Sequence, residues 1–205
     1  MRLYQKLFAR FYDVFMHGFE KSLFKKRKEL ISNLEGTILG VGEGTGVNFQ
    51  FYSDSAKIFA IEPSIPMLEK AKMKANGKNN ITFYNYGIND IDLINQVEEN
   101  SIDSIVCTLV LCTIDYPNLA LSNFKKWLKP NGKLIIMEHI HASKPINKLF
   151  QDFINPTWKL IGDGCNLNRN TDQLIKEAGF MPVQEEYFKR TLRFYSGVFE
   201  LNLNN

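Results

Sequence analysis

The sequence lacks the cysteine pattern of a secreted or zinc-stabilised protein. Its three cysteines, Cys107, Cys112 and Cys165, are odd in number and have no paired CxxC spacing. This argues against a disulfide framework and against a structural zinc site, so no metal ligands are assigned. A reducing compartment is the natural setting for such free thiols, and we expect a cytoplasmic location.

Long apolar runs and a strong net charge are also missing. No stretch approaches the roughly 18 consecutive apolar residues of a membrane span. The first residues, "MRLYQKLFARFYDVF", contain neither a compact apolar region nor a small-residue cleavage site, and we expect no signal peptide. The net charge is only +3, whereas nucleic-acid-binding proteins usually have a concentrated basic face. We therefore expect no nucleic-acid partner.

One positive run stands out, "FKKRK" at Phe24 to Lys28. Such a run is usually a solvated helix face, which is the interpretation we favour. Because it follows an amphipathic segment, it is also compatible with a weak contact at an anionic membrane surface.

The sequence does contain a regular alternation of predicted strands and helices. Its 205 residues, 44% of them hydrophobic, fit a single domain over 1–205, without repeats or linkers. Helices are expected over 3–33, directly after the glycines near 46, and over 64–76, 118–132 (with its closing turn) and 171–179. Strands are expected over 37–41, 57–61, 81–87, 104–111 and 133–139, and two more within 181–204. This pattern predicts an α/β fold, with a mostly parallel seven-stranded sheet, helices on both faces and an antiparallel terminal hairpin.

The glycine loop "ILGVGEGTGVNFQFY" is the first candidate site. Gly42, Gly44 and Gly46 follow a buried strand at alternate positions. Glycine lets the backbone turn sharply and approach a ligand closely, so this loop favours a ligand cradle over a plain turn. The spacing is GxGxG and not the GxGxxG of dinucleotide folds, and Glu43 places a negative charge where a pyrophosphate would lie. Both features argue against a nicotinamide cofactor.

Glu62 is the second candidate, at the end of the next predicted strand and twenty residues after Gly42. A carboxylate at the tip of this strand can accept hydrogen bonds from both hydroxyls of a ribose.

The glycine loop, "AIEPS", "SIDSIVCTLVL" and "LKPNGKLIIMEH" together resemble the class I S-adenosylmethionine-dependent methyltransferases, which have a Rossmann-like fold. The resemblance covers about residues 36–139. It implies S-adenosylmethionine as cofactor, with the three glycines at its methionine side, Glu62 at its ribose and loop 87–90 at its adenine. "FYDVF" near the start is similar to the stretch of quinone-type and phospholipid-type methyltransferases in which an N-terminal helix closes over the cofactor.

The resemblance divides the chain into a helical lid (1–34), a cofactor-binding core (36–141) and a substrate-side insertion with the terminal hairpin (142–205). The further residues assigned to the cofactor on this basis are Tyr12, Glu43, Asn48, Pro63, Ile88, Asn89 and Thr108.

A narrower resemblance concerns "VCTLVLCTI" and "NPTWKLIGDGCNLNR", which are similar to the small-molecule thiol S-methyltransferases. The second segment lies where this fold usually builds its acceptor pocket. Those enzymes also have an N-terminal hydrophobic anchor, which we do not find in this sequence. The cofactor itself does not require these residues of the second segment: Trp158, Gly162, Asp163, Gly164, Cys165, Asn166 and Arg169.

The sequence departs from the family at two positions. The family usually has an acid at the position of Gly40, which helps to hold the α-ammonium of the cofactor, and a small residue at the position of Glu43. We hypothesise that Glu43 supplies the displaced negative charge. The usual acid of the adenine loop is replaced by Gly87, so Asn89 or Asp90 is expected to contact adenine instead.

Methyl transfer requires an in-line approach of the acceptor and exclusion of water more than strong acid–base chemistry. A thiol or phenol acceptor must still lose a proton, and His139 and Asp163 are the candidate bases. A structural histidine and a turn aspartate are the competing interpretations. Cys112 and Cys165 are interpreted as packing residues of the pocket or core.

We therefore predict a methyltransferase that acts on a small, apolar acceptor. A thiol is favoured, and a phospholipid amine or a quinone-like ring carbon remains open. The alternative function is a non-catalytic module that binds S-adenosylmethionine or S-adenosylhomocysteine, motivated by the changes at Gly40 and Gly87. The sequence does not predict an oligomeric state.

Overall fold

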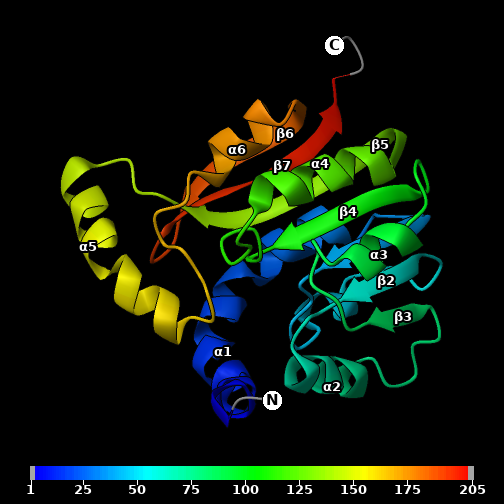
Figure 1. Cartoon of the computed structure of the whole chain (residues 1–205), viewed down its shortest axis with the longest axis horizontal. Helices are drawn as coiled ribbons and strands as arrows, with labels where there is room; N and C mark the ends of the chain where they lie inside the picture. The colour runs from blue at the N-terminus through cyan, green and yellow to red at the C-terminus, as the bar shows by residue number, and fades with distance from the viewer. Residues whose placement is uncertain (1–2, 203–205) are drawn as a thin grey trace.

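The computed structural model describes residues 3–202 and folds them around one seven-stranded sheet (Figure 1). The strands are β1 (Thr37–Val41), β2 (Lys57–Ile61), β3 (Ile81–Tyr84), β4 (Ile102–Thr108), β5 (Leu128–Ile140), β6 (Phe180–Lys189) and β7 (Arg193–Leu201). The α-helices are α1 (Leu3–Ile31), α2 (Ile65–Lys74), α3 (Ile91–Gln96), α4 (Pro117–Trp127), α5 (Pro145–Ile161) and α6 (Thr171–Glu177). The outer ends of the predicted lid and terminal hairpin, residues 1–2 and 203–205, lie outside the described residues.

The strand order is β3-β2-β1-β4-β5-β7-β6. Strands β1 to β5 pair parallel with one another, whereas β7 pairs antiparallel with both β5 and β6. The predicted α/β class, with its seven strands and antiparallel terminal hairpin, is therefore confirmed. Because parallel strands all end at the same edge, the loops after β1, β2, β4 and β5 meet there.

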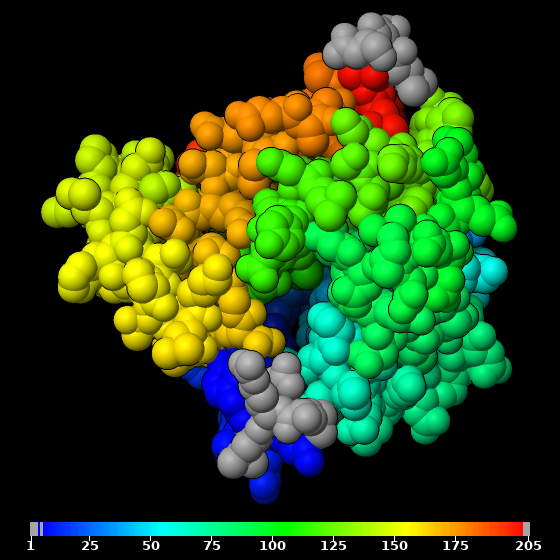
Figure 2. Space-filling view, viewed as in Figure 1, coloured from blue at the N-terminus to red at the C-terminus, as the bar shows by residue number. Residues whose placement is uncertain are grey.

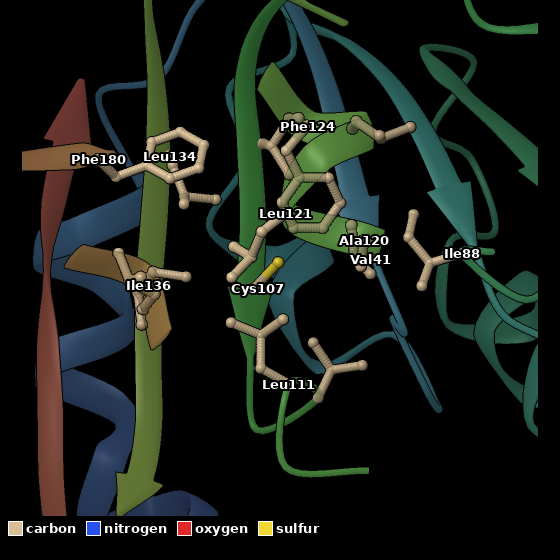
Figure 3. Close-up of a cluster of buried hydrophobic side chains, with 14 of the residues drawn as sticks. Val41, Ile88, Cys107, Leu111, Ala120, Leu121, Phe124, Leu134, Ile136 and Phe180 are labelled. Atoms are coloured by element: carbon tan, nitrogen blue, oxygen red, sulfur yellow. The ribbon is translucent and has the colours of Figure 1, made fainter. Parts of the chain in front are cut away.

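Two apolar layers cover the two faces of the sheet. On one face, Leu121 and Phe124 of α4 and Ile175 of α6 pack against β4 and β5 (Figure 3). On the other face, Leu23 and Ile31 of α1 pack with side chains of α2 and the glycine-loop segment. The central strands are apolar along almost their whole length because both of their faces are covered.

The segment after the glycines differs from the prediction. It forms a four-residue 3₁₀ helix, η1 (Val47–Gln50), where the sequence indicated an α-helix. Phe49, Phe51 and Tyr52 are all buried, so three close-spaced anchors in the core determine the path of this segment. A helix this short contributes little as an anion-binding terminus.

Helices α3 and α5 were not predicted, and the third strand ends at Tyr84, before the predicted end. Helix α5 continues through Pro156, which breaks the usual helix pattern and hides it from sequence inspection. None of the helices in the described part of the chain is both long and apolar enough to cross a membrane.

The amphipathic segment before "FKKRK" lies in α1, and its apolar side chains are only partly buried. Leu23 is fully buried, whereas Leu7, Phe11 and Phe15 are exposed. The carboxyl-terminal half of α1 thus packs on the sheet, and its other half leaves large apolar side chains in solvent.

Candidate cofactor and acceptor site

The glycine loop has the backbone geometry of a ligand cradle. Gly42, Gly44 and Gly46 all have positive φ angles, of 59°, 56° and 80°, which disfavour other residues. A β-carbon on Gly42 would lie 2.2 Å from Val110, and one on Gly46 would lie 2.5 Å from Phe49. A β-carbon on Gly44 would meet nothing within 4 Å. The first and last glycines are thus needed for packing, and the middle one faces open space that a ligand can enter.

Glu62 is held firmly at the tip of β2. The Gly44 amide donates a hydrogen bond to its Oε2 at 2.9 Å, and the Ser64 amide donates to its Oε1 at 2.8 Å. Burial raises the pKa of this carboxyl group. Each oxygen keeps a lone pair, so the carboxylate has the capacity to accept ribose hydroxyls. Pro63, which was also assigned to the cofactor, is exposed beside it.

Glu43 is buried beneath the loop. The Tyr52 hydroxyl donates to Glu43 Oε1 at 2.6 Å, and the Asn48 amide donates to Oε2 at 3.2 Å. Burial raises the pKa of Glu43 to about 7. A β-carbon on Gly40 would lie only 2.0 Å from Glu43 Oε1. The carboxylate therefore occupies the space that a side chain at position 40 would need.

A buried arginine, which was not predicted from the sequence, joins α1 to the residues beneath the glycine loop by hydrogen bonds. Arg27 is 3% exposed. Its Nη1 donates to Asn48 Oδ1 at 2.7 Å and to Thr108 Oγ1 at 2.6 Å, and its Nε donates to Glu20 at 2.9 Å. The interpretation of "FKKRK" as a solvated face is thus wrong for Arg27. Asn48 and Thr108, which were assigned to the cofactor, are linked to α1 through this guanidinium.

Helix α1 is also tied to the glycine loop by Asp13. The Thr45 hydroxyl donates to Asp13 Oδ1 at 2.6 Å, and Lys70 and Lys74 of α2 form ion pairs with the same carboxylate. Burial opposes ionisation, but the hydrogen bonds from Thr45 and Lys74 outweigh it and lower the pKa of Asp13. "FYDVF" was noted in the sequence for its resemblance, and its aspartate is the residue that anchors the lid.

Tyr12 is half-buried next to Asp13, and its ring packs against Phe8. Burial raises the pKa of its hydroxyl. Tyr12 and Asp13 line a cavity of about 450 Å³ between α1 and η1, which Gly46 and Lys74 also border. Neither Glu62 nor the predicted adenine loop lines this cavity, so we place the cofactor on the other side of the glycine loop.

The predicted adenine loop offers one free polar atom. Ile88 is buried. Asp90 Oδ2 accepts a hydrogen bond from the Gly87 amide at 2.6 Å, so this side chain stabilises its own loop. The Asn89 amide nitrogen donates to the Tyr116 carbonyl at 3.1 Å, whereas its buried Oδ1 has no partner. Of the two alternatives for adenine, the geometry favours Asn89.

The structure brings His139 together with two cysteines from other parts of the chain. His139 Nε2 lies 3.1 Å from Cys165 Sγ, and Cys165 Sγ lies 3.6 Å from Cys112 Sγ. The hydrogen bond between the two cysteines, aided by His139, lowers the pKa of Cys165 despite its partial burial. The packing role predicted for the two cysteines is therefore incomplete, because their sulfur atoms form a polar cluster with His139.

The second candidate base, Asp163, is exposed in the turn after α5, with a φ angle of 49°. Partial desolvation raises its pKa. The pKa of the Tyr4 hydroxyl is raised mainly by burial and secondly by the negative charge of Asp163. The Tyr4 hydroxyl and the Asp163 carboxylate are therefore within electrostatic reach of each other. Asp163 thus lies within electrostatic reach of both the lid and Glu62, whose pKa its negative charge also raises.

These loops surround a hollow at the carboxyl edge of the parallel strands. Figure 2 shows it between the loop after β4 (green), the loop after β2 (cyan) and the loop after α5 (yellow-orange), with α1 (blue) below. Arg169 holds two of these loops together, because its Nη1 donates to the carbonyls of Leu111 and Ile114. A small acceptor can approach a ligand on the glycine loop from this side.

Comparison with known proteins agrees with this geometry. Residues 39–136 match the family model described as a methyltransferase domain. The chain is 39% identical over 181 residues to the thiol S-methyltransferase TMT1B of Rattus norvegicus, a match that covers 82% of this chain and 72% of the relative. It is 31% identical to the human thiol S-methyltransferase TMT1A, over 92% of this chain and 81% of the relative.

The fold is also similar to a solved structure, the 1,6-didemethyltoxoflavin-N1-methyltransferase of Burkholderia thailandensis with bound S-adenosylhomocysteine. That match has a TM-score of 0.68 at 12% identity and covers 96% of this chain and 86% of the other. The chain belongs to the class I S-adenosylmethionine-dependent methyltransferases. It is an enzyme of this class, and S-adenosylmethionine is its cofactor.

The residues present fit this cofactor. The open space over Gly44 and the fixed carboxylate of Glu62 provide room and a ribose acceptor. The unpartnered Oδ1 of Asn89 provides a hydrogen-bond acceptor for an adenine amino group.

Proposed function

We propose that this enzyme transfers the methyl group of S-adenosylmethionine to the sulfur of a small, apolar thiol. The observation that carries the proposal is the identity of 39% and 31% to two thiol S-methyltransferases over most of the chain. The structure supports it, because "VCTLVLCTI" and "GDGCNLNR" lie together at the hollow, joined by hydrogen bonds from Asn166 to the Cys112 carbonyl.

The protein side of this reaction is mainly alignment. S-adenosylmethionine supplies an electrophilic methyl group on a sulfonium. Glu62 and the glycine loop hold the cofactor at the edge of the sheet, and the loops after β4 and α5 position the acceptor in line and exclude water. A thiol ionises readily near neutral pH, so its proton requires only modest help. His139 and Asp163 remain the candidate groups for receiving it.

The test is methylation of an acceptor panel by the purified enzyme, with product detection by mass spectrometry. The panel contains small apolar thiols, a phospholipid amine and a quinone-like ring. We expect turnover with the thiols and loss of turnover in Glu62→Ala, with exposed Glu69→Ala as the matched control. Methylation confined to the amine or the ring would identify a different acceptor. Cofactor binding without turnover on any acceptor would support the non-catalytic alternative.

We also propose that Glu43 takes over the role of the acid that the family usually has at position 40. Glu43 is three residues after Gly40, but its carboxylate lies over that glycine. A β-carbon on Gly40 would be 2.0 Å from Glu43 Oε1. Burial raises the pKa of Glu43 to about 7, and the positive charge of a bound α-ammonium group would favour its ionised form.

Finally, we propose that α1 and α5 rest on an anionic lipid surface. Phe11 and Phe15 of α1 and Phe150 and Phe153 of α5 are exposed. The Tyr4 hydroxyl donates to the Ile161 carbonyl at 2.7 Å, so the start of α1 meets the end of α5 (Figure 1). The exposed basic residues beside these faces are Lys6, Arg10, Lys144, Lys148 and Lys159. Apolar side chains flanked by basic ones are typical of helices that lie in a membrane interface.

Flotation with phosphatidylserine-containing vesicles tests this contact. Wild-type protein should float with them, and Phe150→Asp/Phe153→Asp should not. Met73→Asp, at an exposed apolar position of α2, is the matched control. Equal flotation of all three proteins would show that α5 does not contact lipid.

A further inference from the structure

Three side chains with metal-binding atoms converge beside the hollow from three separate segments. Cys112 lies in the turn after β4, His139 near the end of β5 and Cys165 in the loop after α5. The two sulfur atoms and one imidazole nitrogen all lie within 4.8 Å of one another. The nearest pairs are 3.1 Å (Nε2 to Cys165 Sγ) and 3.6 Å (Sγ to Sγ) apart.

Two of the three ligand–ligand distances are close to those of a tetrahedral zinc site, and the third, from Cys112 to His139, is at most 4.8 Å. Zinc bonds of about 2.3 Å to sulfur and about 2.0–2.1 Å to nitrogen place neighbouring ligand atoms about 3.5–3.8 Å apart. The sulfur pair already has this spacing, and the sulfur–nitrogen pair must open by a few tenths of an ångström. Thiolate and imidazole ligands select zinc-like metals over magnesium and calcium.

His139 is a buried polar group that the protein itself leaves poorly satisfied. It is 4% exposed, its Nδ1 has no partner, and its Nε2 faces only the sulfur of Cys165. A thiol is a weak hydrogen-bond partner, and burying a poorly paired polar group is costly. A metal ion bound to Nε2 would replace this weak contact with a strong one.

The backbone around the cluster is braced, so the three ligands are already positioned. The Asn166 amide and side chain both donate to the Cys112 carbonyl, at 3.0 and 2.9 Å. Arg169 donates to the carbonyls on either side, those of Leu111 and Ile114. His139 is held in the sheet by its pairing with Phe194. These contacts fix the backbone positions of the three ligands.

We propose that Cys112, His139 and Cys165 bind one zinc ion with three protein ligands. Three ligands leave the fourth position of the metal open, as in catalytic and not structural zinc sites. The sequence pattern did not predict this site, because its cysteines have no close paired spacing and the three ligands are 27 and 26 residues apart along the chain.

The open position suggests a role, which rests on the proposed thiol methyltransferase function. An acceptor thiol that binds there releases its proton to solvent, because a thiol bound to zinc is deprotonated. The thiolate then attacks the sulfonium methyl group. The old S–CH₃ bond breaks and a new one forms, which gives a neutral thioether and S-adenosylhomocysteine. The thioether carries no charge, binds zinc more weakly and leaves.

The test starts from the full-length protein, stripped with a chelator and kept reduced with a phosphine. We expect one equivalent of Zn²⁺ to bind, measured by calorimetry and elemental mass spectrometry. Co²⁺ should give a thiolate charge-transfer band and the visible bands of a tetrahedral site. Cys165→Ser and His139→Asn should weaken Zn²⁺ binding about a hundredfold or more. Cys107→Ala, which removes a buried cysteine outside the cluster, should bind Zn²⁺ like the wild type.

A second measurement uses only the wild-type protein, so its result does not depend on whether the variants fold. Zn²⁺ should protect Cys165, the half-exposed member of the cluster, from alkylation. No binding of Zn²⁺ or Co²⁺, or binding that does not protect Cys165, would overturn the proposal.

The metal site and the proposed function can fail separately. Zinc binding at the three ligands without methylation of any thiol would support the site and refute the function. Full thiol methylation by a protein shown to be free of metal and unable to take up Zn²⁺ would support the function and refute the site.

Discussion

The carboxylate of Glu43 lies over Gly40, where a β-carbon on the glycine would be 2.0 Å from Glu43 Oε1. Neither residue can therefore be understood alone. A side chain at position 40 requires a small residue at position 43, and the large acid at position 43 requires a glycine at position 40.

This relationship predicts compensation between the two positions. Gly40→Asp alone should destabilise the protein by about 1–3 kcal/mol because it overpacks the site. In Gly40→Asp/Glu43→Ala the clash is removed and a carboxylate is restored, so most of the stability and cofactor affinity should return. Urea unfolding and calorimetry with S-adenosylmethionine measure both. Additive losses in the double variant would contradict the pairing.

The raised pKa of Glu43 predicts how stability changes with pH. In the folded protein Glu43 keeps its proton up to about pH 7, whereas in the unfolded chain it loses it near the ordinary value of 4.5. Stability should therefore fall as the pH rises from about 4.5 to 7, by up to about 3 kcal/mol from this group. Glu43→Gln has no such proton to lose and should lack this component. Parallel pH profiles of the two proteins would show that Glu43 titrates normally, and exposed Glu69→Gln is the control.

Gly44 and Gly77 form a matched pair for testing the cradle. Both have positive φ angles, of 56° and 86°, and a β-carbon on either would meet nothing within 4 Å. Alanine at either position should thus cost a similar amount of stability, about 1–2 kcal/mol from the backbone conformation. Only Gly44→Ala should also weaken S-adenosylmethionine binding, because its methyl group enters the proposed cofactor space. Equal affinities of the two variants would place the cofactor elsewhere.

Arg27 is predicted to hold the lid helix on the sheet. Arg27→Ala removes the hydrogen bonds to Glu20, Asn48 and Thr108 and should destabilise the protein by about 3 kcal/mol. Proteolysis within α1 should become faster at the same time. Lys28→Ala, at the exposed neighbouring position, should be close to neutral. Similar unfolding midpoints for the two variants would argue against this role of Arg27.

The sequence was sufficient for much of the fold because the central strands are nearly continuous apolar runs. Strands β1 and β2 begin and end where the pattern placed them, and Gly42, Gly44, Gly46 and Glu62 come together at one edge of the sheet, as parallel pairing requires. The same pattern did not predict α3, which is only six residues long. It also did not predict α5, because a proline inside a helix, here Pro156, is unusual.

The buried polar contacts were harder to predict because they join distant parts of the chain. Arg27 looked like one member of a basic run, yet its partner Thr108 is 81 residues away. The cluster of His139 and Cys165 depends on the loop after α5 folding back onto β5. The spacing of residues along the chain does not predict such long-range contacts. Asp13 was different, because it lies in "FYDVF", a stretch that the sequence had already singled out.

The placement of β7 between β5 and β6 affects how the molecule can be made. The last strand of the sheet in sequence is an interior strand, bonded along both of its sides. During synthesis, β5 and β6 emerge from the ribosome before the strand that joins them, so each waits with an unpaired edge. The half of the sheet that carries the glycine loop can assemble earlier, but the fold closes only when residues 193–201 arrive. A nascent chain of this enzyme thus passes through a stage in which the edges of β5 and β6 that β7 later covers are open, when protection by a chaperone would matter most.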